Sequence, residues 1–580
     1  MQAPATSEAT TRLEGFAEFV RATIGEWKVP GAAVAVVKDG EVIFSQGFGL
    51  RDMARELEVT PHTLFPIASC TKAFTTMGLA ILVDEGKLDW DAPVRRYVPA
   101  FALHDPVATE RITPRDLVTH RSGLPRHDLA WYKSPCTRQE LFDRLRYLEP
   151  SRDLRAVFQY NNLMYMAAGH VIDYLSGQSW EDFTRARILE PLGMANTLFS
   201  VVEAQQTTDF ARPHKEEKDD QVKEISFYEE QGAIGPAGAI VSSVAEMSGW
   251  VLLHLNQGKQ GDRQIVSAAQ IAQLHAPQVV VPDNGKYAEL PAPVTYGLGW
   301  AIQPYRGHTM IHHAGGINGF TSLVTLLPHE NVGVVVLNNL GSPLPLIVAF
   351  NAIDRLLGLD EVPWSERFMK DHVEWKEGQR KGDEKGEADR VPDTQPSHPL
   401  ESYTGDFVHP GYGTISVAKQ DGGLMATVNA AVRPLTHYHY DIFQLTVDEW
   451  DLPIKLSFST NVKGDIAGFV APFEPAVADI VFKRAPNKEM TEKSFLERFT
   501  GEYEVFGLPL TIALKGDNTL MVSLPGQQDY ELVPQKGTEF SVKGLSAYSI
   551  EFKSDPSGAV TEALLTQPGG VFTARKKSIN

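Results

Sequence analysis

The sequence has very few cysteines: Cys70 and Cys136 are the only two in 580 residues. Two thiols cannot form a disulfide framework, and a zinc-ribbon site needs more of them at closer spacing. The sequence therefore excludes both kinds of stabilisation and favours a reducing compartment.

Long apolar segments are also lacking. No run approaches the roughly 20 residues that a membrane-spanning helix needs, and residues 1–5 have neither the basic nor the apolar part of an export signal. We therefore predict a cytoplasmic location and no membrane partner. An exported mature form stays open, because a leader can be removed from a natural chain.

Positive charge is in short supply, since 54 Lys and Arg stand against 73 Asp and Glu and the formal net charge is −19. Affinity for phosphate backbones and anionic lipids comes mainly from clustered basic residues. We therefore predict no nucleic-acid partner.

Residues 1–360 mix β-branched runs with helical patterns, which is typical of an α/β or α+β domain. The predicted elements are two antiparallel hairpins and a closing helix, over residues 32–37 with 41–46, 322–327 with 333–338, and 345–357. The sheet is therefore expected to be antiparallel, with a largely helical region between the hairpins.

The pattern changes at residue 361. Residues 361–397 lose the earlier pattern, and within them residues 376–387 are charge and glycine with nothing to bury, which predicts a flexible linker. Beyond it the sequence around Gly405 returns around Gly501, together with three further landmarks in the same order. Residues 398–486 and 490–580 are therefore predicted to be two small antiparallel β-barrels, because closure removes exposed strand edges.

Ser69 and Lys72 lie at the start of an apolar helix and, three residues apart, share one of its faces. A helix N-terminus favours negative charge developing on a serine oxygen. Lysine can act as a base there only if its pKa falls well below its usual value of about 10.4. Taken alone, the pair equally fits a helix cap with a solvated lysine.

Two further segments complete a pattern. Tyr160 and Asn162 lie where another apolar helix begins, and His313 is followed by Gly315 and Gly316 before a strand. Serine with lysine, tyrosine with asparagine, and a basic residue followed by x-Gly, in this order, resemble the arrangement of serine β-lactamases and penicillin-binding proteins.

Over residues 13–357 the chain resembles the class C β-lactamase-like serine hydrolases, which include esterases, D-aminopeptidases and D-Ala-D-Ala carboxypeptidases. The resemblance implies that Ser69 is the acylated nucleophile and that Lys72 and Tyr160 share its activation and proton delivery. It also implies that Asn162 hydrogen-bonds the substrate amide and that no cofactor or metal is needed.

In the same family picture the N–H groups of Ser69 and Gly316 form the oxyanion hole, and His313 and Gly315 lie beside the substrate. β-Lactamases carry lysine where this sequence has His313, so the resemblance favours esterase or D-aminopeptidase relatives. The two barrels resemble the lipocalin-like barrels of the D-aminopeptidase branch, where a barrel loop reaches the cleft.

Other residues have simpler interpretations. Cys70 points away from the face of Ser69 and Lys72, which indicates a small buried residue, not a nucleophile. His308 with His312 and His313, and separately His437 with His439, lack carboxylate or thiol partners at a metal-binding spacing. We interpret His120 as a hydrogen-bonded packing residue, and Asn161 either as a solvent-facing loop amide or as a functional one.

The sequence thus predicts a serine hydrolase that forms an acyl-enzyme at Ser69 on small amides, esters or short peptides. One alternative is a β-lactamase or a D-Ala-D-Ala carboxypeptidase or transpeptidase. Another is a catalytically silent ligand-binding protein whose barrels hold the ligand. Self-association into a homo-oligomer stays open.

Overall fold

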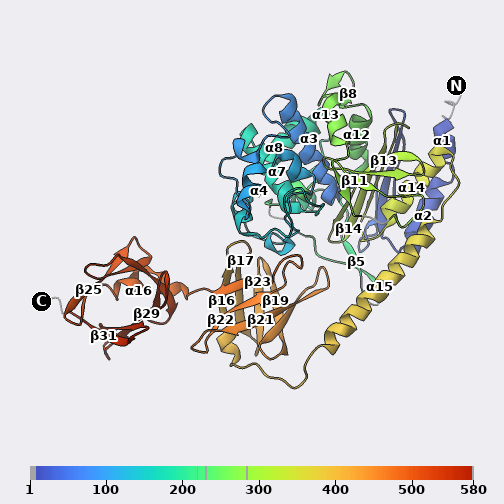
Figure 1. Ribbon diagram of the computed structural model, residues 1–580. Helices are drawn as coiled ribbons and strands as arrows, with labels where there is room; N and C mark the ends of the chain where they lie inside the picture. The colour runs from blue at the N-terminus through green and yellow to red at the C-terminus, as the bar shows by residue number, and fades with distance from the viewer. Residues whose placement is uncertain (1–7, 218–219, 229–231, 283–284, 578–580) are drawn as a thin grey trace.

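The computed structural model describes residues 8–217, 220–228, 232–282 and 285–577. A large N-terminal domain is followed by two barrels in a row (Figure 1). Residues 1–5, which carry neither part of an export signal, lie outside the described residues. Within the described ranges no helix is long and apolar enough to cross a membrane.

A nine-stranded antiparallel sheet forms the centre of the N-terminal domain. In spatial order its strands are β10 (Val279–Val281), β11 (Val294–Tyr296), β12 (Ala301–Tyr305), β13 (His308–Ile317), β14 (Phe320–Leu327), β15 (Val332–Asn338), β1 (Gly31–Lys38), β2 (Glu41–Asp52) and β3 (Leu57–Glu58). Both predicted hairpins are confirmed. β1 pairs with β15 at the middle of the sheet, with Ala35 opposite Val335.

Helices cover both faces of this sheet, which explains why β1 and β15 are apolar up to their last residues, Lys38 and Asn338. Val34 and Val36 pack towards α2 (Phe16–Glu26) and α14 (Leu344–Leu357). Alternate residues Ala33 and Ala35 point to the other face, towards α12 (Val244–Leu255) and a larger helical region. α14 is the predicted closing helix.

The helical region contains two long buried helices, α3 (Thr71–Asp84) and α7 (Asn162–Ser176). The shorter helices of the domain are α1 (Glu8–Arg12), α4 (Pro106–Arg111), α5 (Pro114–Val118), α6 (Arg138–Arg144), α8 (Trp180–Thr184), α9 (Glu190–Leu192), α10 (Val201–Ala204), α11 (Gly235–Gly238) and α13 (Ala268–Leu274). Short strand pairs join β4 (Phe65–Pro66) to β7 (Val241–Ser242), β5 (His214–Glu216) to β6 (Val222–Glu224), and β8 (Lys259–Gln260) to β9 (Arg263–Gln264).

The flexible linker predicted over residues 361–397 is corrected by the structure, in which helix α15 (Trp364–Ala388) occupies most of that range. Buried Trp364 anchors the start of the helix against Phe350 of α14. Further along, Lys376 pairs with Glu216 and Asp220. A helix that is polar on nearly every side is typical of a bridge between domains. Its glycines and charged residues give no amphipathic pattern, so the sequence did not predict it.

Each sequence repeat forms one closed eight-stranded antiparallel barrel, as predicted. The first consists of β16 (Gly405–His409), β17 (Gly413–Gln420), β18 (Gly423–Val428), β19 (Ala431–His439), β20 (Ile442–Val447), β21 (Leu452–Thr460), β22 (Ile466–Ala471) and β23 (Ile480–Arg484). The second, reached through α16 (Lys493–Glu497), consists of β24 (Gly501–Val505), β25 (Leu508–Lys515), β26 (Thr519–Ser523), β27 (Tyr530–Lys536), β28 (Glu539–Val542), β29 (Leu545–Ser554), β30 (Val560–Gln567) and β31 (Gly570–Lys576).

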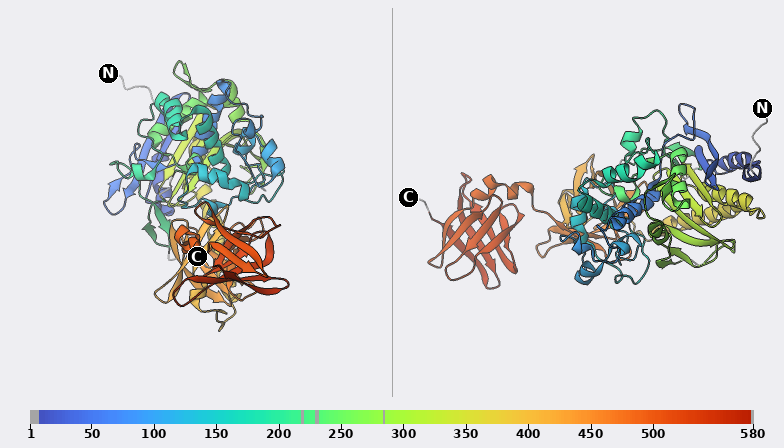
Figure 2. Two further views of the ribbon diagram at one scale, coloured as in Figure 1. Left: turned by 90° about the vertical axis from the view of Figure 1, so that its left-hand side faces the viewer. Right: turned by 90° about the horizontal axis from the view of Figure 1, so that it is seen from above.

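The two barrels relate differently to the rest of the molecule. Buried side chains of the first barrel belong to the same apolar cluster as the helical region, whereas the second barrel has a core of its own. In two views at right angles the second barrel lies beyond the first, away from the N-terminal domain (Figures 1 and 2). Exposed ion pairs, Lys463 with Glu539 and Lys536 with Asp465, join the two barrels.

Candidate active site

Ser69 lies in a single 3₁₀ turn, η1 (Ala68–Cys70), between β4 and α3. The preceding Ala68 has a φ of 47°, a left-handed conformation that is costly for a residue with a side chain. Residues from Thr71 to Leu82 of α3 are buried, so the helix that follows is held firmly. The chain therefore turns sharply at Ser69, and the serine faces a large cavity.

Lys72 is fully buried, and its Nζ lies 3.1 Å from Ser69 Oγ. The same Nζ lies 2.7 Å from Asn162 Oδ1 and 2.8 Å from the carbonyl oxygen of Ala237. Burial, assisted by the charge of Arg126, holds the pKa of Lys72 well below its ordinary value. Both of these oxygens can only accept hydrogen bonds, so they take the two N–H bonds of a neutral amine and leave its lone pair for Ser69.

Tyr160 also contacts the serine. Burial raises the pKa of its hydroxyl above the ordinary value, and a hydrogen bond with Ser69 opposes that rise only in part. The Lys72 Nζ is 4.9 Å from the centre of the Tyr160 ring. The site therefore brings together a lysine whose pKa is lowered and a tyrosine whose pKa is raised.

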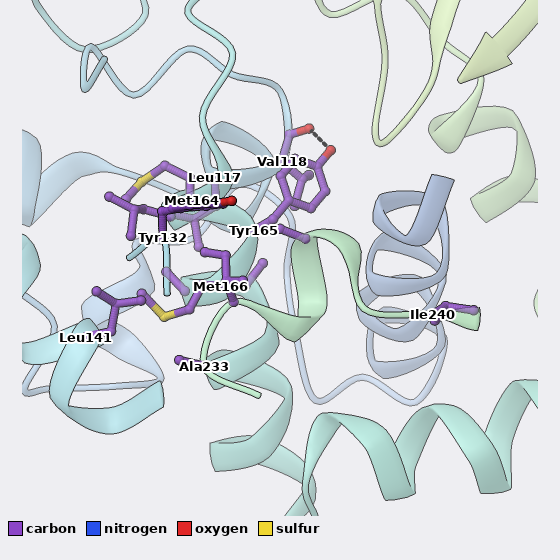
Figure 3. Close-up of a cluster of buried hydrophobic side chains, with 14 of the residues drawn as sticks. Leu117, Val118, Tyr132, Leu141, Met164, Tyr165, Met166, Ala233 and Ile240 are labelled. Carbon is purple, nitrogen blue, oxygen red and sulfur yellow. Dashed lines mark hydrogen bonds between the residues drawn. The ribbon is translucent and has the colours of Figure 1, made fainter. Parts of the chain in front are cut away.

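α7 places Asn162 and Asn161. The tyrosine that follows on the helix, Tyr165, donates a hydrogen bond to the carbonyl of Val118 at 2.6 Å, amid apolar side chains of α5, α6 and α7 (Figure 3). Asn161 is fully buried and caps the helix, because its Oδ1 accepts from the N–H of Met164. Its interpretation as a solvent-facing amide is wrong.

His120 is the packing residue that the sequence predicted. Its ring is buried, and its Nδ1 accepts a hydrogen bond from the N–H of Asn161 at 3.0 Å. Burial lowers the pKa of His120 well below its ordinary value, so the ring is uncharged.

The third motif lies on β13. His313 is 5% exposed, and its two ring nitrogens lie 2.9 Å from the Tyr296 hydroxyl and 2.7 Å from the Ala314 carbonyl oxygen. Burial, with a smaller effect of Lys72, lowers the pKa of His313 to about 3. His313 is therefore a neutral residue behind the cavity wall, while Gly316 forms part of the wall itself.

Gly315 is required for close packing. A Cβ at this position would lie 2.2 Å from the carbonyl oxygen of Ile67, in the segment just before Ser69. The absence of a side chain therefore lets β13 approach the turn that carries the serine.

Cys70, the residue after the serine, is buried, and burial raises the pKa of its thiol to about 12. It is the small buried residue that we expected.

The cavity has a volume of about 1360 Å³. Ser69, Tyr160, Asn162 and Gly316 line one part of it, and residues 448–451 of the first barrel line another. The described residues of its lining include none from the second barrel. The expectation that a barrel loop reaches the cleft thus holds for the first barrel.

Residues 448–451, here called the barrel loop, contact the N-terminal domain through one aromatic contact and two ion pairs. Trp450 packs on Tyr132 with ring centres 4.4 Å apart, Glu449 pairs with Lys133, and Asp451 pairs with Lys215 at 2.8 Å. In the described ranges we find no group of three or more His, Cys, Asp or Glu side chains that could hold a metal ion.

Sequence reasoning missed several residues of the site. The carbonyl of Ala237 holds Lys72 from α11, and Arg126 lies 5.4 Å from the Tyr160 ring while paired with Asp128. A backbone carbonyl carries no sequence signal of its own. Arg126 could be suspected only from its place shortly after the Gly123 turn.

The fold, together with the serine and lysine at the start of α3, is that of a β-lactamase-type domain. The chain belongs to the Beta-lactamase family, whose profile matches residues 16–354. A domain of unknown function, DUF3471, matches residues 389–484, which contain the first barrel.

Among curated proteins, the chain is similar to the unguisins hydrolase ungD' of Aspergillus campestris, with 30% identity over 426 residues that cover 70% of this chain and 77% of that protein. It is also similar to the protein flp of Staphylococcus aureus strain MW2, with 27% identity over 334 residues that cover 54% and 60%.

Two solved structures share the fold. The octameric penicillin-binding protein homologue from Pyrococcus abyssi has a TM-score of 0.53 and 24% identity, over 81% of this chain and all of that one. The D-amino acid amidase from Ochrobactrum anthropi SV3 has a TM-score of 0.50 and 23% identity, over 61% and 99%.

Proposed function

We propose that this protein is a serine hydrolase that forms an acyl-enzyme at Ser69 on amides or esters. The observation that carries the proposal is the position of the Lys72 Nζ, 3.1 Å from Ser69 Oγ with acceptors on its other two sides. This arrangement supplies a base beside a nucleophile without any other group.

In the proposed reaction the lone pair of Lys72 takes the proton from Ser69 Oγ as the oxygen attacks the substrate carbonyl carbon. The N–H groups of Ser69 and Gly316 stabilise the resulting oxyanion. Tyr160 donates its proton to the leaving nitrogen or oxygen as the bond breaks, and the Lys72 ammonium returns a proton to the tyrosine. Water then attacks the acyl-enzyme by the same steps in reverse.

Substrates of the D-aminopeptidase and esterase kind fit this site best. His313 is uncharged, so the position that is a lysine in β-lactamases offers no cation to a substrate carboxylate. The family membership and the similarity to a protein named as a hydrolase support hydrolytic chemistry. A β-lactamase or carboxypeptidase activity is the second candidate. For that activity the site lacks a cation at position 313 to bind the substrate carboxylate.

The remaining alternative is a silent protein that binds ligands in its barrels. Against it, apolar side chains fill both interiors, such as Phe407 and Phe469 in the first barrel and Phe540 and Phe552 in the second. A cavity large enough for a ligand is lined by Ser69 and lies outside both barrel interiors.

The test is covalent labelling. A fluorophosphonate probe should add its mass to Ser69 of the full chain, and Ser69→Ala should abolish both labelling and turnover of p-nitrophenyl acetate and D-amino acid amides. Tyr160→Phe should lose about 10²–10⁴ in rate. Retained turnover in Ser69→Ala would overturn the proposal, and faster hydrolysis of a chromogenic cephalosporin than of the esters would favour the second candidate.

A further inference from the structure

The cavity is larger than a small amide requires. Pockets for drug-sized ligands typically have volumes of about 300–1000 Å³, whereas this one has about 1360 Å³. It extends from Ser69 past the barrel loop to helix α15, whose residues form its remote wall. The small substrates expected from the sequence would leave that wall without contacts.

One face of α15 forms the remote wall. His372, Trp375, Lys376, Gln379 and Arg380 line the cavity at spacings of three and four residues, the repeat of a single helix face. α15 and the first barrel lie on either side of the β5–β6 hairpin (Figure 1). The wall thus belongs to the segment that the sequence had marked as a linker.

Ion pairs with the β5–β6 hairpin fix this face of α15 relative to the N-terminal domain. Lys376 lies 2.9 Å from carboxylate oxygens of both Glu216 and Asp220, next to the β5–β6 hairpin. On the same hairpin Lys215 pairs with Asp451 of the barrel loop. The hairpin therefore ties helix and barrel together, and Lys376 is occupied by its own partners.

Trp375 and Arg380, unlike Lys376, are exposed enough to contact a ligand. Trp375 is 56% exposed although it lines the cavity, and its ring stacks on His372 at 5.9 Å. Arg380 has its ion-pair contact with Glu384 at 4.0 Å, and both side chains are largely exposed. Tryptophan and arginine are enriched among the residues that contribute most to binding at protein interfaces.

The charges of the cavity indicate what kind of ligand it accepts. Its acidic and basic side chains largely neutralise one another, as in the pairs Arg126 with Asp128, Lys133 with Glu449 and Lys215 with Asp451. Aromatic rings such as Trp131 and Tyr132 line the same cavity. A chain with apolar side chains and regularly spaced carbonyl groups fits such a wall better than a polyanion does.

We propose that Trp375, Gln379 and Arg380 form a remote subsite for the distal part of a peptide substrate that reacts at Ser69. An apolar or aromatic side chain of the peptide stacks on Trp375, and Gln379 and Arg380 donate hydrogen bonds to its carbonyl oxygens. This inference rests on the proposed function and adds that the substrate is a peptide of several residues.

The test compares short and long substrates with the full chain. Fluorogenic peptides of two, four, six and eight residues, extended on either side of the scissile bond and ending in Phe, are measured beside p-nitrophenyl acetate. We expect kcat/KM to rise with peptide length. Trp375→Ala should lower kcat/KM for the longest peptides about tenfold, mainly through KM, and leave the ester unchanged.

Trp375→Phe should retain most of the effect of length, and Arg380→Ala should reduce it independently. Val373→Ala is the matched control, because Val373 is an exposed apolar residue of α15 outside the cavity lining. Octapeptides cleaved no better than dipeptides, or an equal loss in Trp375→Ala and Val373→Ala, would overturn the subsite while ester turnover still supported Ser69. Absence of ester turnover and of labelling in the unmodified chain would overturn the proposed function itself.

Discussion

The imidazole of His120 stacks on the ring of Tyr160, with centres 4.3 Å apart and planes inclined by 30°. The same histidine binds both neighbours of the tyrosine. Its carbonyl accepts from the N–H of Gln159 at 2.7 Å, and its Nδ1 accepts from the N–H of Asn161 at 3.0 Å. His120 therefore fixes the backbone on both sides of Tyr160 and the plane of its ring.

Two variants of His120 separate these effects. His120→Phe keeps a ring beneath Tyr160 and loses the acceptor for Asn161, whereas His120→Asn keeps an acceptor and suits the φ of 58° but removes the stacking. We expect each to lower kcat by about tenfold to a hundredfold with little change in KM, because a misplaced proton donor slows chemistry. A change in KM alone, measured with p-nitrophenyl acetate, would contradict this positioning role.

The pH dependence should report on Lys72. Activity requires the neutral amine, so kcat/KM should rise as pH increases through the pKa of Lys72 and level off well below pH 10, since that pKa is lowered. Arg126→Ala removes a nearby cation and leaves Asp128 without its ion-pair partner. Both changes favour the ammonium, so the rising limb should move to higher pH.

Arg115→Ala is the control for this shift, because Arg115 pairs with Asp91 and is not among the charges that act on Lys72. Its pH profile should match that of the unmodified chain. An unmoved limb in Arg126→Ala would mean that another group controls the profile.

A substitution at Gly315 tests whether close packing of β13 on η1 positions Ser69. Gly315→Ala introduces a methyl group 2.2 Å from the Ile67 carbonyl, so β13 must move away from η1. We expect kcat/KM to fall by about a hundredfold or more. Gly316→Ala, whose added carbon meets nothing within 4 Å, should lose far less. Equal losses, measured on folded proteins with matching circular dichroism, would show that space is not the cause.

Truncation should distinguish the two barrels. A chain that ends at Pro486 loses only the second barrel, whose core is separate and whose exposed ion pairs to the first contribute about 0–1 kcal/mol each. It should stay soluble and hydrolyse esters at an unchanged rate. A chain that ends at Leu359 loses the first barrel as well and should aggregate.

The reason is the contact surface of the first barrel. Asn429 Nδ2 donates to the carbonyls of Leu129 and Tyr132, and Tyr412 hydrogen-bonds buried His127 at 2.7 Å. A soluble, active chain that ends at Leu359, as judged by size-exclusion chromatography and ester turnover, would contradict a shared core.

Much of this fold follows from local sequence signals. The β-branched runs of β1 and β15 and the Asp39-Gly40 turn predict the strands and hairpins directly, and Gly405 and Gly501 mark the start of two equivalent barrels. Ser69 and Lys72 are close because they lie three positions apart, where the η1 turn runs into α3. These features depend on neighbours in the chain.

The remaining features depend on contacts between distant segments. Burial and the charge of Arg126 lower the pKa of Lys72, and Asn162 and Ala237, 90 and 165 residues away, accept hydrogen bonds from its Nζ. His313 lies behind the cavity wall because Tyr296 binds its ring. The 25 residues of α15 form a helix because Trp364 and Lys376 find partners on the N-terminal domain. No local pattern contains those partners.

The length of α15 has a consequence for how this chain can change. A helix rotates by one turn every 3.6 residues and advances about 1.5 Å per residue. One residue inserted before Trp375 would turn that side chain and Arg380 by more than a quarter of a circle, away from the cavity. Seven inserted residues would restore the rotation but move the first barrel about 10 Å from Tyr132. This connection therefore sets both an angle and a separation, and it tolerates insertions and deletions far less than a flexible tether of the same composition.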